Sequence, residues 1–86
     1  MVLIHSECYD ILDVVDYMKS REYSVQEVQL GNIINFKKRT TEFLYNVQFC
    51  KVKDDIYKLN SAYVYTINDG NIDGSKQMNE TELKLI

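Results

Sequence analysis

Apolar residues recur at the spacing of an amphipathic helix over the stretch from Ser6 to Ser20. Residues three and four positions apart share one face of a helix, and the apolar residues of this stretch follow that spacing. Ser6 is the expected N-cap, because its hydroxyl accepts a hydrogen bond from an unpaired backbone N–H of the first turn. We therefore predict a helix over 6–20 that packs on the core. Its expected core face consists of Cys8, Ile11, Leu12, Val15 and Met18.

The opposite face of this helix is acidic and carries two large rings. A charged helix face is most simply a solvated one. Tyrosine is also enriched in protein–protein interfaces, so the face is a candidate contact surface for a basic partner. The candidate partner-binding residues are Tyr9, Asp10, Asp13, Asp16 and Tyr17.

Residues 22–30 fit two local structures. Alternating apolar residues indicate a strand with a bulge, whereas Ser24 and Glu27 have the spacing of a capping box at the start of a short helix. The turn signal Gly31–Asn32 follows directly and is typical of a hairpin. This signal favours the strand.

Three longer stretches alternate apolar and polar residues, as strands with one buried face do. The tail 81–86 is either a last short strand or frayed. We predict an α+β fold in which the N-terminal amphipathic helix packs on a four- to five-stranded antiparallel meander. The chain forms a single domain over 1–86, with 72–86 as a short edge strand or a flexible tail. The expected strands are 33–39, 41–53 and 56–67, and the expected turns are 54–55, 68–71 and 73–75.

The last two long strands define a second apolar surface. If Lys53 lies opposite Ile56, simple register places Lys51 opposite Lys58, a like-charge pair that suits an anionic partner. One helix covers only one face of the sheet, so apolar residues on the reverse face lack an evident cover. The C-terminal tail or strong twist would hide them, whereas a homodimer or another partner would bury them. These residues are Leu44, Tyr57, Leu59, Tyr63 and Tyr65.

Charge is distributed unevenly along the 86 residues, whose formal net charge is −3. All charged residues in the range 1–18 are acidic. The range 19–58 has a small excess of Lys and Arg, and the range 59–86 has an excess of Asp and Glu. Cations beside aromatic rings on a sheet are typical of nucleic-acid modules, although an acidic net charge favours a solvated patch. The candidate anion or nucleic-acid patch consists of Lys37, Lys38, Arg39, Lys51 and Lys58.

The chain carries few of the residue patterns that catalysis or metal binding requires. His5 and Cys8 supply two metal ligands at most, and Cys50 has no histidine partner that the pattern places nearby. There is no nucleotide-binding glycine motif. We therefore predict no catalytic site, no metal site and no cofactor. Two cysteines are too few for a disulfide scaffold, so both are expected to be free, buried thiols in a reducing compartment.

These observations favour a small, non-enzymatic protein-binding module. No stretch is long and apolar enough to span a bilayer, the acidic helix face has the wrong sign for anionic lipid, and a signal peptide is not expected. Frequent Asn, Lys, Ile and Tyr are typical of an AT-rich coding sequence. The favoured hypothesis is a phage- or mobile-element-encoded inhibitor that blocks a nucleic-acid-processing or defence protein in the host cytoplasm. The alternatives are a nucleic-acid-binding protein that uses the basic patch and a homo-oligomerising accessory protein.

Overall fold

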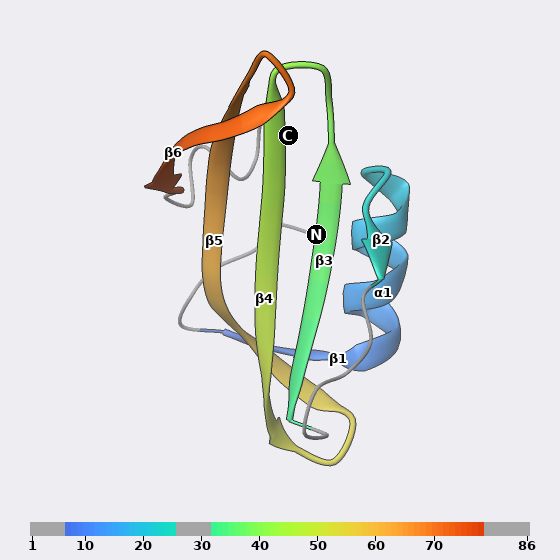
Figure 1. Cartoon of the computed structure of the whole chain (residues 1–86). Helices are drawn as coiled ribbons and strands as arrows, with labels where there is room; N and C mark the ends of the chain where they lie inside the picture. Colours follow the sequence, from blue (N-terminus) through green and yellow to red (C-terminus); the bar gives the residue numbers. More distant parts are fainter. Residues whose placement is uncertain (1–6, 26–31, 79–86) are drawn as a thin grey trace.

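The computed structural model describes residues 7–25 and 32–78. In this part of the chain, six strands form one antiparallel sheet that curls into a half-barrel, and one helix lies against it (Figure 1). The predicted α+β class and antiparallel sheet are confirmed, with more strands than expected. The elements are β1 (Cys8–Asp10), α1 (Ile11–Ser20), β2 (Ser24–Val25), β3 (Ile33–Arg39), β4 (Phe43–Lys53), β5 (Ile56–Asn68) and β6 (Asn71–Gln77).

The helix α1 begins later than its pattern predicts. Cys8–Asp10 pairs with β5 as a strand, which holds this part of the backbone extended, and helical structure starts at Ile11. Asp10 is the N-cap, since its Oδ1 accepts a hydrogen bond from the backbone N of Leu12 at 2.9 Å. The prediction of Ser6 as N-cap is therefore wrong, and Ser6 itself lies outside the described residues.

The buried face of α1 is partly rotated from the expected one, since Met18 is buried and Ile11 and Val15 pack against the core as predicted. Val14 and Met18, one helical turn apart, are buried against the sheet. Leu12, which the pattern places in the core, is 70% exposed. Cys8 was also expected in the core, but it lies in β1 and is exposed. Both predictions fail because Cys8–Asp10 forms a strand and the helix starts only at Ile11. The direction in which the chain passes from β1 into α1 then determines which side of the helix faces the sheet.

The strands β2 to β6 pair in chain order, as a meander, and β1 joins the edge of β5 that β6 also uses. The strand interpretation of 22–30 applies at Ser24–Val25, while 26–30 lie outside the described residues. The tail 81–86 lies outside them too.

The turns of the sheet follow local sequence with one exception. Asp69 and Gly70 join β5 to β6 with φ of 52° and 81°, the positive values that a two-residue hairpin turn requires. The turn expected at 73–75 is wrong, because these residues lie within β6. Gly74, with φ of 97°, supplies the positive φ where the pairing of β6 with β5 is irregular.

Two bulges in the β4–β5 hairpin change which side chains meet the core. The expected pair Lys53–Ile56 is present, but Val52 on β4 and Asn60 on β5 have no opposite residue. Between these two points the register is shifted by one residue, and such a shift turns each side chain to the other face. A bulge also bends its strand, and β5 bends strongly in Figure 1.

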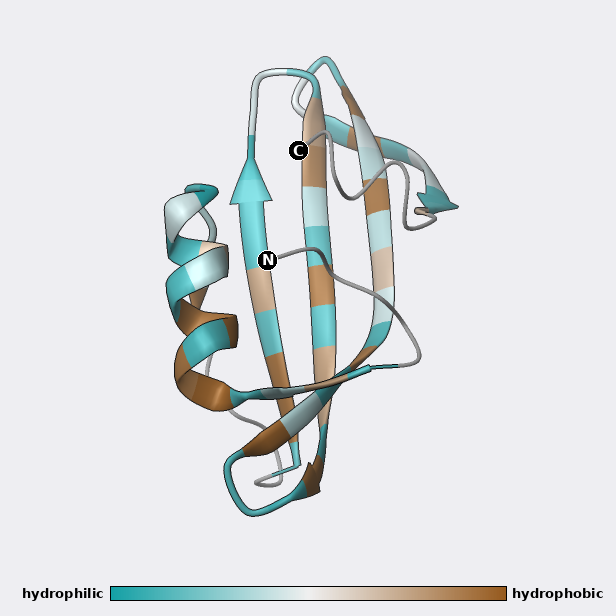
Figure 2. Cartoon of the chain, turned by 180° about the vertical axis from the view of Figure 1, so that it is seen from behind, coloured by the Kyte–Doolittle hydropathy of each residue, from teal (hydrophilic) through white to brown (hydrophobic). Residues whose placement is uncertain are grey.

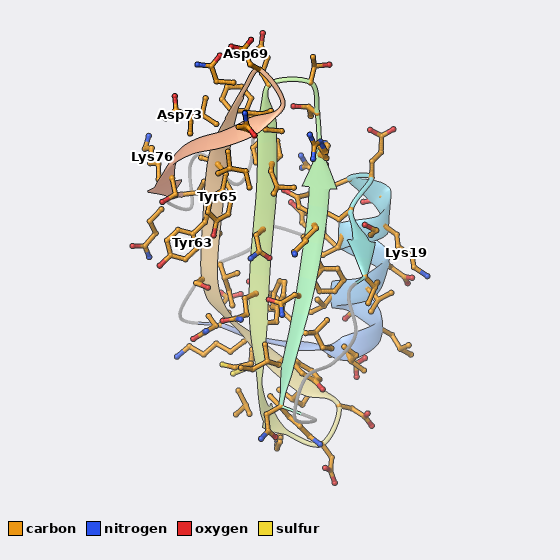
Figure 3. The ribbon with its side chains drawn as sticks, viewed as in Figure 1. Lys19, Tyr63, Tyr65, Asp69, Asp73 and Lys76 are labelled. Atoms are coloured by element: carbon orange, nitrogen blue, oxygen red, sulfur yellow. The ribbon has the colours of Figure 1, made fainter. Side chains whose placement is uncertain are left out.

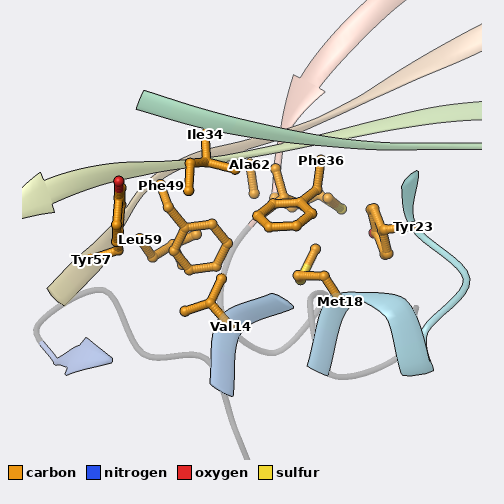
Figure 4. Close-up of a cluster of buried hydrophobic side chains, with 11 residues drawn as sticks. Val14, Met18, Tyr23, Ile34, Phe36, Phe49, Tyr57, Leu59 and Ala62 are labelled. Atoms are coloured by element: carbon orange, nitrogen blue, oxygen red, sulfur yellow. The ribbon is translucent and has the colours of Figure 1, made fainter. Parts of the chain in front are cut away.

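The shift moves Tyr57 and Leu59 from the reverse face into the core. Leu59 lies opposite Phe49 and is 2% exposed, and Tyr57 is 8% exposed. Figure 4 shows both side chains on the side of the sheet that faces α1. The prediction that they belong to an uncovered surface is therefore wrong, because simple alternation does not allow for the bulge at Asn60.

The core lies between α1 and the sheet (Figure 4), and apolar residues alternate with polar ones along β4 (Figure 2). Phe36 and Phe49 meet edge to face, with ring centroids 5.6 Å apart. Met78 joins this core, and its backbone N donates to the carbonyl of Ala62 at 2.8 Å. Met78 thus packs on the helix side, whereas one alternative from the sequence places the C-terminal tail over the reverse face. The buried residues are Val14, Met18, Tyr23, Ile34, Phe36, Val47, Phe49, Tyr57, Leu59, Ala62 and Met78.

Candidate functional site: the outer face of the sheet

The outer face is the side of the sheet turned away from α1. Buried Phe36, Val47 and Ala62 form one cross-strand row on the inner side, so the residues that flank them along each strand point outward. By the same alternation, the residues one and three positions from this row form two outward rows that cross β3, β4 and β5 next to each other. Each row has a cation on β3 and a tyrosine on β5, about 10 Å apart at the usual spacing of strands. The rows are Arg39–Leu44–Tyr65 and Lys37–Asn46–Tyr63.

These six residues, Lys37, Arg39, Leu44, Asn46, Tyr63 and Tyr65, are called the ring–cation surface below. The rings of Tyr63 and Tyr65 lie side by side, with centroids 6.5 Å apart and planes inclined by 33° (Figure 3). Both tyrosines are half-buried. They therefore present adjacent aromatic surface beside two cations on one face of the molecule.

A ladder of amide side chains continues the outer face below the two rings. Gln48 Nε2 donates to Asn35 Oδ1 at 3.1 Å, and Asn60 Nδ2 donates to Gln48 Oε1 at 2.5 Å. The ladder crosses three strands and holds these amides in fixed orientations. Among the described residues, Asn46 Oδ1 is buried without a hydrogen-bond partner, which costs free energy until a donor reaches it.

The strands β3, β4 and β5 are free of carboxylates. β3, β4 and β5 hold six of the ten Lys and Arg residues and none of the thirteen Asp and Glu residues. An acidic protein thus concentrates positive charge on the sheet. This signal was visible in the sequence, but it requires charge to be counted strand by strand. The six bases are Lys37, Lys38, Arg39, Lys51, Lys53 and Lys58.

The predicted basic patch divides between the two faces. Lys37 and Arg39 belong to the ring–cation surface, and Lys58 lies farther along the outer face, opposite Cys50. Lys38 points inward, where its Nζ lies 5.7 Å from the ring centroid of Tyr23. The predicted patch is therefore not one surface, because only some of its residues lie on the outer face.

The predicted like-charge pair of Lys51 with Lys58 is wrong. The register shift at Val52 places Lys51 opposite Tyr57 on the inner side. Lys51 Nζ lies 3.5 Å from a carboxylate oxygen of Asp54, in an exposed ion pair of small energetic value.

The predicted uncovered face keeps three of its residues. Leu44, Tyr63 and Tyr65 remain outward, while Tyr57 and Leu59 are in the core as described above. The sequence predicts the apolar face and the basic patch as two separate surfaces. In the structure, the outward members of both lie together in the ring–cation surface.

The predicted acidic helix face is not one surface. Asp10 caps α1, and Tyr9 and Tyr17 pack against the core. Asp13 and Asp16 remain exposed on the helix. Only these two carboxylates stay available on α1 in the way the pattern predicts.

Tyr23 is a buried polar residue on the inner side that sequence patterns do not single out. Its hydroxyl has no hydrogen-bond partner within the described ranges. Burial raises the pKa of Tyr23 far above its ordinary value of 10.0, and Tyr45 and Tyr17 raise it further. Tyr23 therefore stays neutral in the fold.

Both cysteines are free thiols, as expected, although Cys8 is exposed and Cys50 half-buried. They lie in one row on either side of Lys58, two strands apart. That separation is about 10 Å, beyond the roughly 7 Å limit between Cα atoms for a disulfide.

Residues 7–25 and 32–78 contain no group of three His, Cys, Asp or Glu side chains placed to hold a metal ion. Their helix is too short and too polar to cross a membrane. Comparisons with protein-family models, with curated proteins and with solved structures gave no match to this chain.

Proposed function

We propose that this protein is a small, non-enzymatic module that binds nucleic acid through the ring–cation surface. The observation that carries the proposal is the meeting of Tyr63, Tyr65, Lys37 and Arg39 on one face of three strands that lack carboxylates. Lysine and arginine supply the phosphate contacts that dominate nucleic-acid affinity, and aromatic side chains add stacking. The three strands that form this face contribute no carboxylate to it, so the negative net charge of the protein is not concentrated there.

The proposal is tested by fluorescence anisotropy with labelled mixed-sequence oligonucleotides over a range of salt concentrations. The double variant Lys37→Ala with Arg39→Ala removes both cations of the surface, and Lys19→Ala on α1 removes one distant cation as the matched control (Figure 3). We expect the double variant to weaken binding and to reduce the slope of log K against log salt by about 1.4–1.8, because each lost phosphate contact contributes roughly 0.7–0.9. Absence of salt-dependent binding, or an equal loss in Lys19→Ala, would overturn the proposal.

A second candidate is the protein-binding inhibitor of a host nucleic-acid-processing or defence protein, encoded by a phage or mobile element. It is supported by one observation on α1, where Leu12 is 70% exposed beside exposed Asp13 and Asp16. An exposed leucine next to carboxylates suits a partner with a basic, partly apolar groove. Affinity purification from the host tests it. The double variant Asp13→Lys with Asp16→Lys should lose a partner that the unaltered protein and Lys19→Ala both retain.

A further inference from the structure

We infer that the ring–cation surface selects single-stranded over duplex nucleic acid, with two adjacent bases stacked on Tyr63 and Tyr65 and the phosphates directed toward Lys37 and Arg39. The inference rests on the proposed function and specifies its ligand. Its basis is a repeat in the structure, since the two rows of this surface present the same chemistry twice.

The repeat has the dimensions of a nucleotide chain. The two rows are two residues apart along β5, which is about 6.7 Å in a strand, and the ring centroids are 6.5 Å apart. Successive nucleotides of an extended single strand have a comparable repeat. Each of two neighbouring nucleotides can therefore meet one tyrosine and one cation. The bases of a duplex are already stacked and paired, so the same rings cannot reach their faces.

The charges around the surface set how the strand lies across it. Asp69 belongs to the β5–β6 turn, and Asp73 and Lys76 belong to β6, so the tyrosine side of the surface carries both signs of charge (Figure 3). Lys37 and Arg39 are on β3, at the opposite side. Phosphates are therefore favoured over β3, where every charged side chain is a cation, and this leaves the bases over the rings of β5.

The middle residue of each row, on β4, lies where the sugar of a nucleotide would pass between its phosphate and its base. Leu44 offers an apolar contact between Arg39 and Tyr65. Asn46, between Lys37 and Tyr63, carries the side-chain oxygen that lacks a partner among the described residues. A small rotation of this amide would let it accept a hydrogen bond from a base or sugar donor.

The test compares one labelled DNA decamer as a single strand and as a duplex, using the full chain. Variants Tyr63→Leu and Tyr65→Leu remove the rings and keep apolar bulk, and Tyr63→Phe and Tyr65→Phe are matched controls that keep the rings. We expect tighter binding of the single strand, and a loss of roughly 5- to 150-fold for each leucine variant. The phenylalanine variants keep the stacking ring and should retain most of the binding that the leucine variants lose. Thermal unfolding confirms that each variant is folded.

Three outcomes separate this inference from the proposed function. Equal binding of duplex and single strand, with leucine variants unaffected, would overturn stacking while salt-dependent binding still supports a nucleic-acid module. Absence of salt-dependent binding to both probes would overturn the function and the inference together. Sedimentation that shows a dimer dissociated by Tyr63→Leu would also overturn both, since a second copy of the chain would then occupy this surface.

Discussion

Three leucines provide a direct stability test of the register and helix orientation described above. Leu59 is 2% exposed, Leu44 is half-buried on the outer face, and Leu12 is 70% exposed on α1. The same substitution, Leu→Ala, applied at each position therefore samples three degrees of burial with one chemical change. Simple alternation and the helical pattern predict the reverse order for Leu12 and Leu59.

The expected magnitudes follow from burial. Leu59→Ala removes buried methyl groups and leaves a cavity beside Phe49, which costs about 2–5 kcal/mol of unfolding free energy. Leu12→Ala loses little apolar burial and gains helix propensity, so its cost is about 0.5 kcal/mol or less. Leu44→Ala should lie between them. The total free energy of unfolding of a domain of this length is roughly 4–13 kcal/mol, so Leu59→Ala should remove a large fraction of it.

Thermal and urea unfolding followed by circular dichroism measures all three variants. With about 4–8 °C lost for each kcal/mol, Leu59→Ala should lower Tm by roughly 8–40 °C, while Leu12→Ala should shift it by about 4 °C or less. A cost at Leu12 equal to or greater than the cost at Leu59 would refute the rotated helix face and the bulge at Asn60.

Other predictions concern the helix cap, the buried hydroxyl and the thiols. Asp10→Ala should cost about 0.5–2 kcal/mol in the same unfolding assay through loss of the N-cap, and no cost would contradict the cap. Tyr23 is held neutral in the fold, so stability should fall as pH rises above 10.0, the ordinary tyrosine pKa. Tyr23→Phe should reduce that fall, and an unchanged fall would contradict the burial of this hydroxyl. In a thiol-reagent assay Cys8 should react faster than Cys50, and mild oxidation should form no disulfide between them within one chain; detection of that bond would contradict the strand positions.

The long strands could be predicted because their alternation is strong and their turns are chemically distinct. β4 and β5 and the polar turn between them lie close to their expected bounds. The bulge at Asn60 could not be predicted, because neither glycine nor proline marks it. Its cause is tertiary: shifting the register brings Tyr57 and Leu59 under the helix, where they fill the core.

The helix start was missed for a related reason. Cys8–Asp10 carries a residue pattern that also fits a helix, and pairing with β5 overrides that local preference. Asp10 was therefore assigned to an acidic contact face although it caps the helix. Both errors show that a periodic pattern identifies an element more reliably than it fixes the bounds or phase of that element.

The candidate site required knowledge of the strand register. The tyrosines of β5 and the cations of β3 are more than twenty residues apart in sequence, and β4 lies between them in the sheet. Pairing of Asn46 with both Lys37 and Tyr63 brings one row together. The sequence identified the residue types of both sets, but it could not place them on one face.

Mapping the binding surface by NMR tests the central claim most directly. A ¹⁵N-labelled sample titrated with a short single-stranded DNA reports which backbone amides change their environment. We expect the largest shifts at Lys37, Asn46, Tyr63 and Tyr65, with residues near Lys19 on α1 unchanged. Shifts concentrated on α1, or no shifts at DNA concentrations that saturate the anisotropy signal, would contradict the assignment of nucleic-acid binding to the outer face.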